Sequence, residues 1–501
     1  MKLAALLLSV LMGTPVFAAD WPMYGHDQKQ TRSNPGETLI TPANVGKLTS
    51  AWFFPTTAPV SATTAVVKGT VYVGSWDHNF YALDAVSGAV KWKVTVATPQ
   101  GDGKFPGIQS SSAVANGRVY FGDSCGYLHA YPADGSGAPP RASSNMTVRN
   151  RGCGSTGSES PGFPIDIGGA LPNPADAVNT DLFSSAIPFT PNAGAQAGRK
   201  MIYIGAASHQ DSPCIHGALF AIDALKGSIV WRFDTVPQSS IGGAVWSTPA
   251  IDALNNLVYI DTGDCVNNSS SGLSESIIAL DASCSGTSVD GSCKNLPSVT
   301  YPPGPLTPGN PVWAFQAHPN GDLQDLDFGS SPNVISNSVG TPVLVGGGSK
   351  DGTYYAVNAG RGASAGTLAW KTTVAAASPA GGFQGSTGFA AGKIFGTSVS
   401  GPLFEVGLDA FSGSVQWTAP DAIASFSPVG IAGGLVFAGD AIGNLKARSL
   451  DGGLPLFTFS ANGSIASGPV IANGGMVFFG VGTTSDNIEQ FGIHALRLPA
   501  H

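Results

Sequence analysis

The sequence predicts an all-β fold, an eight-bladed β-propeller of four-stranded blades, on three observations. A repeat recurs along the chain, and its closing Trp residues lie 40 positions apart between Trp52 and Trp92 and 47 apart between Trp370 and Trp417, which fits one four-stranded blade. Short runs of small residues open each copy. Glycine (67) and proline (36) are abundant among the 501 residues, so turns are frequent and long helices scarce.

The clearest copy of the repeat spans Thr70–Trp92 and reads as a strand, a turn, a strand, a second turn with Gly and a strand that ends in Trp. The same frame returns in copies ending at Trp231, Trp370 and Trp417. Trp52, Trp313 and Phe457 take the same closing position in other copies. We therefore expect the closing aromatic side chains to pack between adjacent blades as scaffold.

The opening strands number eight and consist of small residues, as expected where inner propeller strands crowd around an axis: 62–65, 110–114, 184–186, 247–250, 330–333, 385–390, 427–429 and 467–470. The last copy lacks its Trp strand, whereas residues 48–54 contain one without a preceding copy. We therefore predict that this N-terminal strand completes the eighth blade and removes a free sheet edge.

This ring predicts a single domain over residues 20–501, although a chain of this length would usually form about three domains. Two segments rich in Gly, Ser, Pro and Asn interrupt the repeat, at 141–180 and at 266–309. They are either binding loops or neutral surface decoration.

The N-terminus predicts a secretory signal peptide over residues 1–19. Lys2 precedes an apolar run from Leu3 to Met12, and small residues follow as far as Ala19. The run is too short for a membrane-spanning helix, which needs about 20 apolar residues, and no later stretch qualifies. We expect a periplasmic or secreted protein. The net charge of −8 argues against a nucleic-acid partner and gives no basic patch for an anionic membrane.

Six cysteines form an even set, which an oxidising compartment permits to pair. Proximity along the chain suggests Cys284 with Cys293 and Cys125 with Cys153, leaving Cys214 with Cys265, among 15 possible pairings. No C-x-x-C-H haem motif and no C-x-x-C zinc pair occurs.

The repeat "YALDAxxGxxxW" resembles that of the quinoprotein family, eight-bladed propellers built from pyrroloquinoline-quinone (PQQ) repeats, and the similarity is greatest to the polyvinyl alcohol dehydrogenase branch. The resemblance implies a PQQ-dependent alcohol dehydrogenase. Non-catalytic propellers that help assemble outer-membrane proteins share this repeat, so a binding or assembly module is the alternative. The site motifs decide between the two.

Trp246, in "GAVWSTPAID", resembles the family's Trp that lies flat against the quinone. Eighteen residues further on, Asp264 lies where the family commonly has an Asn that supplies an oxygen to Ca²⁺. The family places a Glu ligand in the preceding blade, where Gln210 or Asp211 could serve. Asp264 and Asp211 could also be loop-capping acids.

The resemblance assigns the catalytic base to Asp327 in "DLDFGSSPN" and the quinone-polarising cation to Lys350 in "GSKDG". Asp327 would also be a metal ligand. The two residues belong to one repeat, near the starts of its first and second strands, so they can meet at one face of the ring. The alternative is a solvated turn acid and a Lys-Asp-Gly hairpin.

The chain departs from the family pattern at three points. No adjacent Cys-Cys pair occurs, Phe183 takes a cofactor-binding position where Thr is common, and the Arg that binds a PQQ carboxylate has only Arg149, Arg151 and His216 as candidates. Gly329 stands where lanthanide-using relatives have a second Asp, which favours Ca²⁺.

By this resemblance, the cofactors are PQQ and Ca²⁺ and the substrate is an alcohol, secondary or polymeric by similarity to the polyvinyl alcohol branch. Hydride passes from the alcohol carbon to the quinone while Asp327 takes the hydroxyl proton. Without a haem motif, a separate cytochrome or quinone accepts the electrons.

Overall fold

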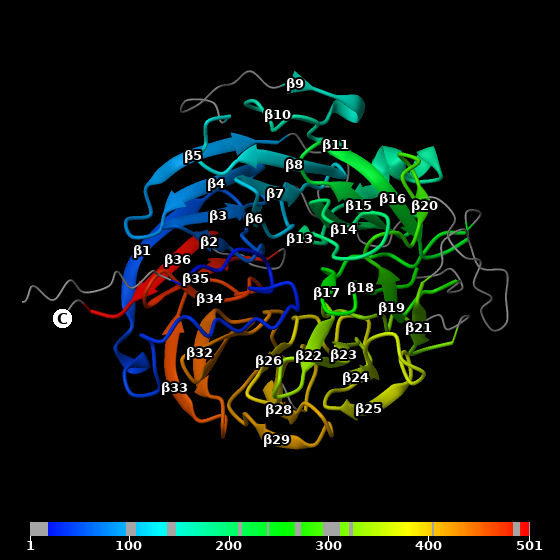
Figure 1. Ribbon diagram of the computed structural model, residues 1–501. Coiled ribbons are helices and arrows are strands. Elements are labelled where there is room, and N and C mark those ends of the chain that lie inside the picture. Colours follow the sequence, from blue (N-terminus) through cyan, green and yellow to red (C-terminus); the bar gives the residue numbers. More distant parts are fainter. Residues whose placement is uncertain are drawn as a thin grey trace, which may run out of the picture.

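The computed structural model describes residues 19–96, 107–137, 147–208, 213–237, 240–265, 272–293, 311–319, 324–402, 405–483 and 491–499. Its strands form a ring of eight antiparallel sheets, which confirms the predicted propeller (Figure 1). All of the predicted signal peptide except Ala19 lies outside the described residues.

The first four blades follow one another along the chain and are listed with their strands from the axis outward. Blade 1 holds β2 (Ala65–Val67), β3 (Thr70–Gly74), β4 (Asn79–Asp84) and β5 (Val90–Thr95). Blade 2 holds β6 (Ala113–Ala115), β7 (Arg118–Gly122), β8 (Tyr127–Pro132) and β11 (Ile165–Asp166). Blade 3 holds β13 (Ile187–Phe189), β14 (Met201–Ser208), β15 (Ala218–Asp223) and β16 (Ser228–Asp234). Blade 4 holds β17 (Ala250–Asp252), β18 (Leu257–Asp261), β19 (Ser276–Asp281) and β21 (Trp313–Gln316).

The other four blades complete the ring in the same order. Blade 5 holds β22 (Asn333–Ser336), β23 (Pro342–Gly348), β24 (Thr353–Asn358) and β25 (Leu368–Thr373). Blade 6 holds β26 (Gly388–Ala390), β27 (Lys393–Thr397), β28 (Glu405–Asp409) and β29 (Val415–Thr418). Blade 7 holds β30 (Gly430–Ala432), β31 (Leu435–Gly439), β32 (Asn444–Ser449) and β33 (Pro455–Ser460). Blade 8 holds β34 (Val470–Ala472), β35 (Met476–Val481), β36 (Phe491–Arg497) and β1 (Thr49–Thr56).

Blade 8 joins the two ends of the described chain. Strand β1 pairs antiparallel with β36, from Thr49 opposite Arg497 to Thr56 opposite Phe491. The predicted closure by an N-terminal strand is confirmed. With β1 in place, the sheet of blade 8 has four strands, like the sheets of blades 1 and 7 beside it. No strand is missing where the two ends of the chain meet.

Both interrupting segments contribute strands at the rim. The first contains β9 (Thr147–Val148), β10 (Gly154–Ser155), β11, three short 3₁₀ helices and β12 (Thr180–Asp181); the helices are η2 (Asn150–Gly152), η3 (Gly168–Ala170) and η4 (Pro174–Asn179). Strand β11 serves as the outer strand of blade 2, where the other copies have their closing strand. From the second segment, β20 (Thr287–Ser288) adds to the outer edge of blade 3. A further 3₁₀ helix, η1 (Val45–Lys47), precedes β1.

In five of the eight blades, the closing Trp side chain ties the blade to the next one, as predicted. Five indole N–H groups donate to backbone carbonyls of the following blade: Trp52 to Ala85, Trp92 to Ala133, Trp313 to Gly360, Trp370 to Ala410 and Trp417 to Leu450. In blade 3 the closing Trp231 is fully buried, and the Tyr203 hydroxyl donates to the Ala282 carbonyl of blade 4 instead.

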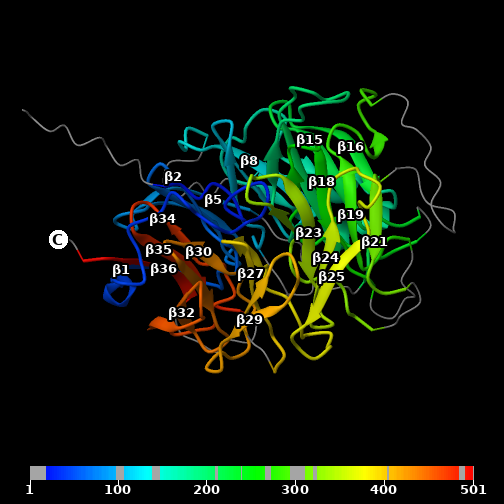
Figure 2. The ribbon, with the colours of Figure 1, turned by 60° about the horizontal axis from the view of Figure 1, so that its bottom comes forward.

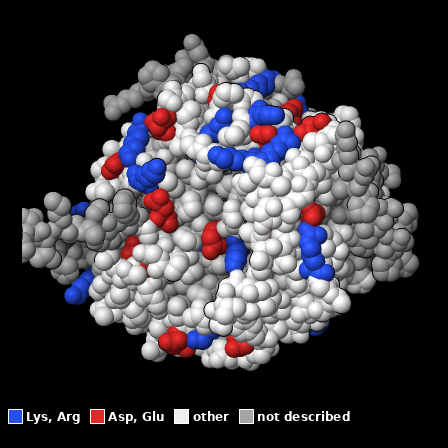
Figure 3. Space-filling model, viewed as in Figure 1, with Lys and Arg blue, Asp and Glu red and all other residues white. Residues whose placement is uncertain are grey.

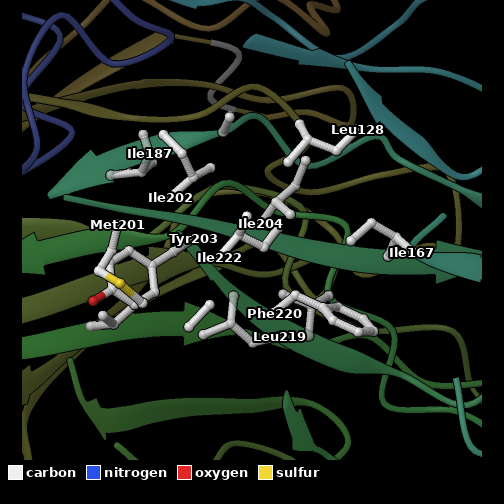
Figure 4. Close-up of a cluster of buried hydrophobic side chains, with 14 of the residues drawn as sticks. Leu128, Ile167, Ile187, Met201, Ile202, Tyr203, Ile204, Leu219, Phe220 and Ile222 are labelled. Carbon is white, nitrogen blue, oxygen red and sulfur yellow. The ribbon is translucent and has the colours of Figure 1, made fainter. Parts of the chain in front are cut away.

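The hydrophobic core lies between blades, because both faces of each sheet are covered by its neighbours. Strand β14 is buried along its whole length, and Figure 4 shows its Ile202, Tyr203 and Ile204 among side chains of β13 and β15. Figure 2 shows β18 between β15 and β23, so that three successive sheets are stacked. Continuous apolar strands such as "MIYIGAA" suit this two-sided burial.

The segment Trp21–Asn34, which we name the axial segment, pairs with the inner strand of every blade. In Figure 1 the deep-blue N-terminal chain lies across the middle of the ring. Its backbone or side-chain groups hydrogen-bond eight equivalent inner-strand residues, in blade order Val66, Val114, Pro188, Ile251, Val334, Phe389, Ile431 and Ile471. In every blade, this partner lies four positions after the first residue of the small-residue run. The eight contacts are therefore equivalent by position. The axial segment therefore pairs polar backbone groups that the innermost strands would otherwise leave unmatched.

Three disulfides join the pairs expected from proximity: Cys125 with Cys153, Cys214 with Cys265, and Cys284 with Cys293. Within the described residues, no helix has the length and apolar character needed to cross a membrane. Charged side chains gather in a few groups separated by wide uncharged areas on the face seen in Figure 3, in keeping with a charged content of 11%.

Candidate functional site

All eight inner strands begin at the same end of the ring, and the residue before each small-residue run faces the axis there. These eight residues, which we name the mouth ring, line one axial pocket of about 180 Å³: Ser61, Gln109, Phe183, Trp246, Gly329, Gln384, Phe426 and Ala466. The chain thus places one residue of each blade around a common opening, as the predicted convergence at one face requires.

A ring of hydroxyl groups two positions further on fixes this arrangement. In six of the eight blades, the backbone N–H at this position donates to the side-chain hydroxyl at the equivalent position of the next blade, over distances of 2.9–3.0 Å: Gly468 to Thr63, Thr63 to Ser111, Ser111 to Ser185, Ser185 to Thr248, Thr248 to Ser331 and Ser331 to Ser386. Small hydroxyl residues in the opening strands therefore connect the blades as well as fit the crowded axis.

Trp246 is held on both sides by backbone contacts. The Val245 N–H donates to the Ala206 carbonyl of blade 3, and the Ser247 hydroxyl donates to the Asp261 carbonyl of β18. The indole Nε1 then donates to Asp327 Oδ2 at 3.1 Å. Trp246 belongs to blade 4 and Asp327 precedes the inner strand of blade 5, so this contact crosses the boundary between two blades.

Lys350 approaches the same carboxylate from the end of β23. Its Nζ lies 2.7 Å from Asp327 Oδ1 and 2.5 Å from Asp325 Oδ1, and its backbone N–H donates to the Asp327 carbonyl. The ammonium also lies 5.6 Å from the centroid of the Trp246 ring, within the range of a cation–π contact. The structure thus brings the predicted Trp246, Asp327 and Lys350 together.

Lys350 is 6% exposed, so its charge depends on its neighbours. Burial alone would lower the pKa of Lys350, but attraction to Asp327 and Asp325 and hydrogen bonds to both carboxylates outweigh burial and raise it above its ordinary value. The side chain is therefore a permanent cation at the mouth of the ring over the physiological pH range.

Three carboxylates form an acidic cluster beside this cation. One oxygen from each of Asp264, Asp325 and Asp327 lies within 4.8 Å of the other two. Gly263 allows this approach, because a Cβ at that position would lie 2.4 Å from Asp327 Oδ2 and 3.2 Å from Trp246 Nε1. Carboxylate oxygens are the ligands that Ca²⁺ prefers, so the cluster has the donor chemistry of a site for a hard cation.

Sequence reasoning placed Asp264 and Asp327 in this cluster but not Asp325. The signal for Asp325 was its spacing of two from Asp327, since alternate residues of an extended segment point to the same side. The predicted Asp211 lies outside the described residues, in the gap 209–212. The disulfide Cys214–Cys265 joins the end of that gap to the residue directly after Asp264.

Phe183, Trp246 and Lys350 line a chamber of about 480 Å³ that shares part of its wall with the axial pocket. Its described lining is mostly apolar, with Lys350, Gln384 and Ser208 as the polar side chains. A chamber of this size, apolar with a few convergent polar groups, is typical of a small-molecule site. Neither Gln384 nor Phe426, which line both cavities, was singled out from the sequence.

The three candidates for binding a carboxylate of the cofactor are engaged elsewhere. Arg149 pairs with Glu159 at 3.1 Å, Arg151 with Asp166 at 2.9 Å, and His216 with Asp234 at 3.4 Å. None of the three is among the described residues that line the chamber.

Comparison with known proteins identifies relatives with this architecture. Residues 21–134 match the family model of the PQQ-type "Glucose/ethanol/alcohol dehydrogenase, beta-propeller domain". The chain is 25% identical over 327 residues to the polyvinylalcohol dehydrogenase of Sphingopyxis sp. (strain 113P3), covering 55% of this chain and 48% of that protein. It is 23% identical over 509 residues to the polyvinylalcohol dehydrogenase of Pseudomonas sp., covering 92% of this chain and 72% of that protein.

A solved structure shares the fold over nearly the whole chain. The quinohemoprotein alcohol dehydrogenase from Comamonas testosteroni superimposes with a TM-score of 0.70 at 18% identity, over 96% of this chain and 81% of that one. The chain spans about half or less of the length of the first curated relatives that it matches. The resemblance predicted from the sequence is confirmed: the chain is similar in sequence to quinoprotein alcohol dehydrogenases, and it shares the fold of a quinohemoprotein alcohol dehydrogenase.

Proposed function

We propose that the protein is an exported quinoprotein oxidoreductase that oxidises an alcohol with PQQ and Ca²⁺. The observation that carries the proposal is the convergence of Trp246, Asp327 and Lys350 from two neighbouring blades. Trp246 and Lys350, which both contact Asp327, line the wall of one chamber. The relatives named as alcohol dehydrogenases support the same activity.

The residues present fit both groups. Trp246 offers an aromatic face for a planar quinone, and Lys350 offers a cation that can hydrogen-bond its oxygens. Phe183 adds an apolar surface at the same wall. Asp264, Asp325 and Asp327 would hold Ca²⁺, whose preference for several oxygen ligands suits three clustered carboxylates. Lys350 pairs with Asp325 and Asp327, so Ca²⁺ would share those two carboxylates with it.

PQQ supplies a quinone that accepts hydride, and Ca²⁺ supplies Lewis acidity. The chain supplies position and charge. Asp327, held at both oxygens by Trp246 and Lys350, accepts the proton of the alcohol hydroxyl as general base. Lys350 keeps its own proton, because its raised pKa makes it a cation, and it would stabilise negative charge on the oxygens of a bound quinone. The apolar chamber wall excludes water from the reacting atoms.

The partners and the compartment are part of the same proposal. A separate cytochrome or quinone would accept the electrons, since the sequence contains no haem-attachment motif. Three disulfides are consistent with export to an oxidising compartment such as the periplasm. Similarity to polyvinylalcohol dehydrogenases suggests secondary or polymeric alcohols.

Reconstitution tests this function. The purified protein is incubated with PQQ and Ca²⁺, freed of unbound cofactor, and assayed for alcohol-dependent reduction of an artificial electron-accepting dye. We expect retained quinone absorbance and dye reduction that depends on both PQQ and Ca²⁺. Absence of PQQ binding at any Ca²⁺ concentration would overturn the proposal and favour a non-enzymatic binding or assembly propeller.

A further inference from the structure

Phe426 contributes an exposed aromatic ring to the chamber. It is the mouth-ring residue of blade 7 and lines both the chamber and the axial pocket. Its exposed fraction is 38%, whereas most other Phe side chains of the described chain are buried or half-buried. Within the described residues, no ring contact of Phe426 with another aromatic side chain is found. Packing of the blades therefore does not explain a phenyl group at this position.

The backbone on either side of Phe426 is fixed. The Ser425 N–H donates to the Ser398 carbonyl of blade 6, and its hydroxyl donates to the Gly439 carbonyl at 2.7 Å. The Ser427 hydroxyl donates to the Ser467 carbonyl of blade 8 at 2.9 Å. Both serines are buried. These bonds to three blades present the phenyl ring to the chamber from a rigid base, as expected of a preorganised binding surface.

The chamber wall near this ring is apolar. Pro379 and Ala380, from the connection between blades 5 and 6, line the chamber together with Phe426. Phe183 and Trp246 line it as well, and Lys350, which pairs with Asp327 at 2.7 Å, is one of its polar side chains. A ligand whose hydroxyl meets Asp327 therefore has apolar surface available for the rest of its molecule.

We propose that Phe426 is a specificity-determining residue that binds the hydrocarbon chain of the alcohol, so that the protein prefers neutral alcohols with an extended alkyl part. This inference rests on the proposed function for the identity of the reacting end. Burial of each further methylene against the phenyl ring would raise kcat/KM about fourfold until the chamber is filled. The rigid backbone at Ser425 and Ser427 makes this surface available without rearrangement.

A series of primary alcohols from ethanol to 1-hexanol tests the inference with the PQQ- and Ca²⁺-loaded protein. In the wild type, kcat/KM should rise with each methylene. In Phe426→Ala, kcat/KM should change little with each added methylene, while kcat for ethanol should stay within about twofold of the wild-type value. The matched control is Phe411→Ala, which removes a phenyl ring of 47% exposure at the turn between β28 and β29, away from the chamber. This control should keep the wild-type increment.

A binding measurement separates this inference from the proposed function. Saturation-transfer NMR of 1-hexanol with the purified protein should show the strongest transfer at the methyl end of the chain, and Phe426→Ala should abolish that preference. If alcohols are not oxidised but this transfer depends on Phe426, the proposed function fails and the chamber inference stands. If Phe426→Ala keeps both the wild-type kcat/KM increment and the wild-type transfer pattern, the inference is overturned.

Discussion

The indole Nε1 of Trp246 donates a hydrogen bond of 3.1 Å to Asp327 Oδ2, across a boundary between blades and 81 positions of sequence. Lys350 holds the other oxygen of the same carboxylate at 2.7 Å. Because both oxygens of Asp327 are engaged, the orientation of the carboxylate is set by two blades at once. The carboxylate is therefore held in one position, as its proposed role of general base requires.

Removal of the Lys350 charge should destabilise the protein. Lys350→Met leaves the half-buried Asp325 and the buried Asp327 beside each other without their cation, and breaking a buried ion pair on one side costs about 3–5 kcal/mol. We expect the free energy of unfolding, measured by urea denaturation without metal, to fall by about 3–5 kcal/mol.

The double variant Asp325→Asn/Lys350→Met is the control for this prediction. It removes one of the two negative charges together with the cation, so its free energy of unfolding should lie between those of the wild type and Lys350→Met. Equal stability of the single and double variants would contradict this account, because it would show that the charge of Asp325 does not repel Asp327 when Lys350 is absent.

Much of the scaffold could be predicted because propeller blades repeat their physical requirements. Small residues at the axis recur in every copy, and a closing Trp and a Gly turn recur in most copies, so the eight blades and their closure by β1 can be predicted from the sequence. The disulfides follow from proximity along the chain. Trp246 stood out because it interrupts a series of small or unlike residues at the opening strands.

Other features escaped prediction because they depend on non-local pairing. The axial segment passes all the blades as one non-repeating stretch of chain, so it carries no period that a sequence can display. Phe426 is recognisable only when the eight opening strands are placed in register by position, one residue before Ser427. The sequence motif assigned a role to Asp327 and none to Asp325, two positions before it. The half-buried position of Asp325 beside Lys350 is visible only in the folded structure.

His129 should make stability depend on pH on the alkaline side. Its ring lies 3.0 Å from Asp123 and 3.1 Å from Glu159, and it is buried. Burial alone would lower the pKa of His129, but Glu159 and Asp123 raise it to about 9. The unfolded value is about 6.5, so the contribution is full below pH 6.5 and is lost as pH rises to about 9.

Thermal unfolding between pH 6 and 9.5 measures this effect. The wild type should lose roughly 3 kcal/mol at most over that window, whereas His129→Gln should start less stable and show a flatter profile. Parallel profiles for the two proteins would mean that His129 is not charged in the folded state.

The axial segment should stabilise the closed ring. Asn34 is 2% exposed, and its Nδ2 donates to the Ile471 carbonyl of blade 8 at 2.9 Å and to the Asp20 carbonyl at 3.2 Å. Asn34→Ala leaves these buried acceptors unmatched, which costs about 1–3 kcal/mol. Denaturant unfolding should show this loss. In Asn44, the side-chain amide donates an exposed hydrogen bond to the Leu39 carbonyl, so Asn44→Ala should lower the free energy of unfolding clearly less. Equal losses would argue that the segment is not specifically held.

The disulfide Cys214–Cys265 should affect metal affinity through Asp264. Cys265 directly follows Asp264, so the Cys214→Ser/Cys265→Ser variant loses a covalent restraint on one carboxylate of the acidic cluster. We expect weaker Ca²⁺ binding by at least about threefold in isothermal titration. The Cys284→Ser/Cys293→Ser variant removes a disulfide across nine positions and outside the cluster, and should bind Ca²⁺ like the wild type. Equal weakening in both variants would point to general loosening of the fold.

The most direct test of the account is the reduction of bound PQQ by an alcohol in the wild type and in Asp327→Asn, followed by absorbance after rapid mixing. Asn keeps the size of the side chain and an acceptor for the Trp246 N–H, but it cannot take a proton from a hydroxyl group. We expect both proteins to bind PQQ, with reduction in Asp327→Asn slower by about a hundredfold or more. Reduction at the wild-type rate in Asp327→Asn would contradict the role of this carboxylate as the base.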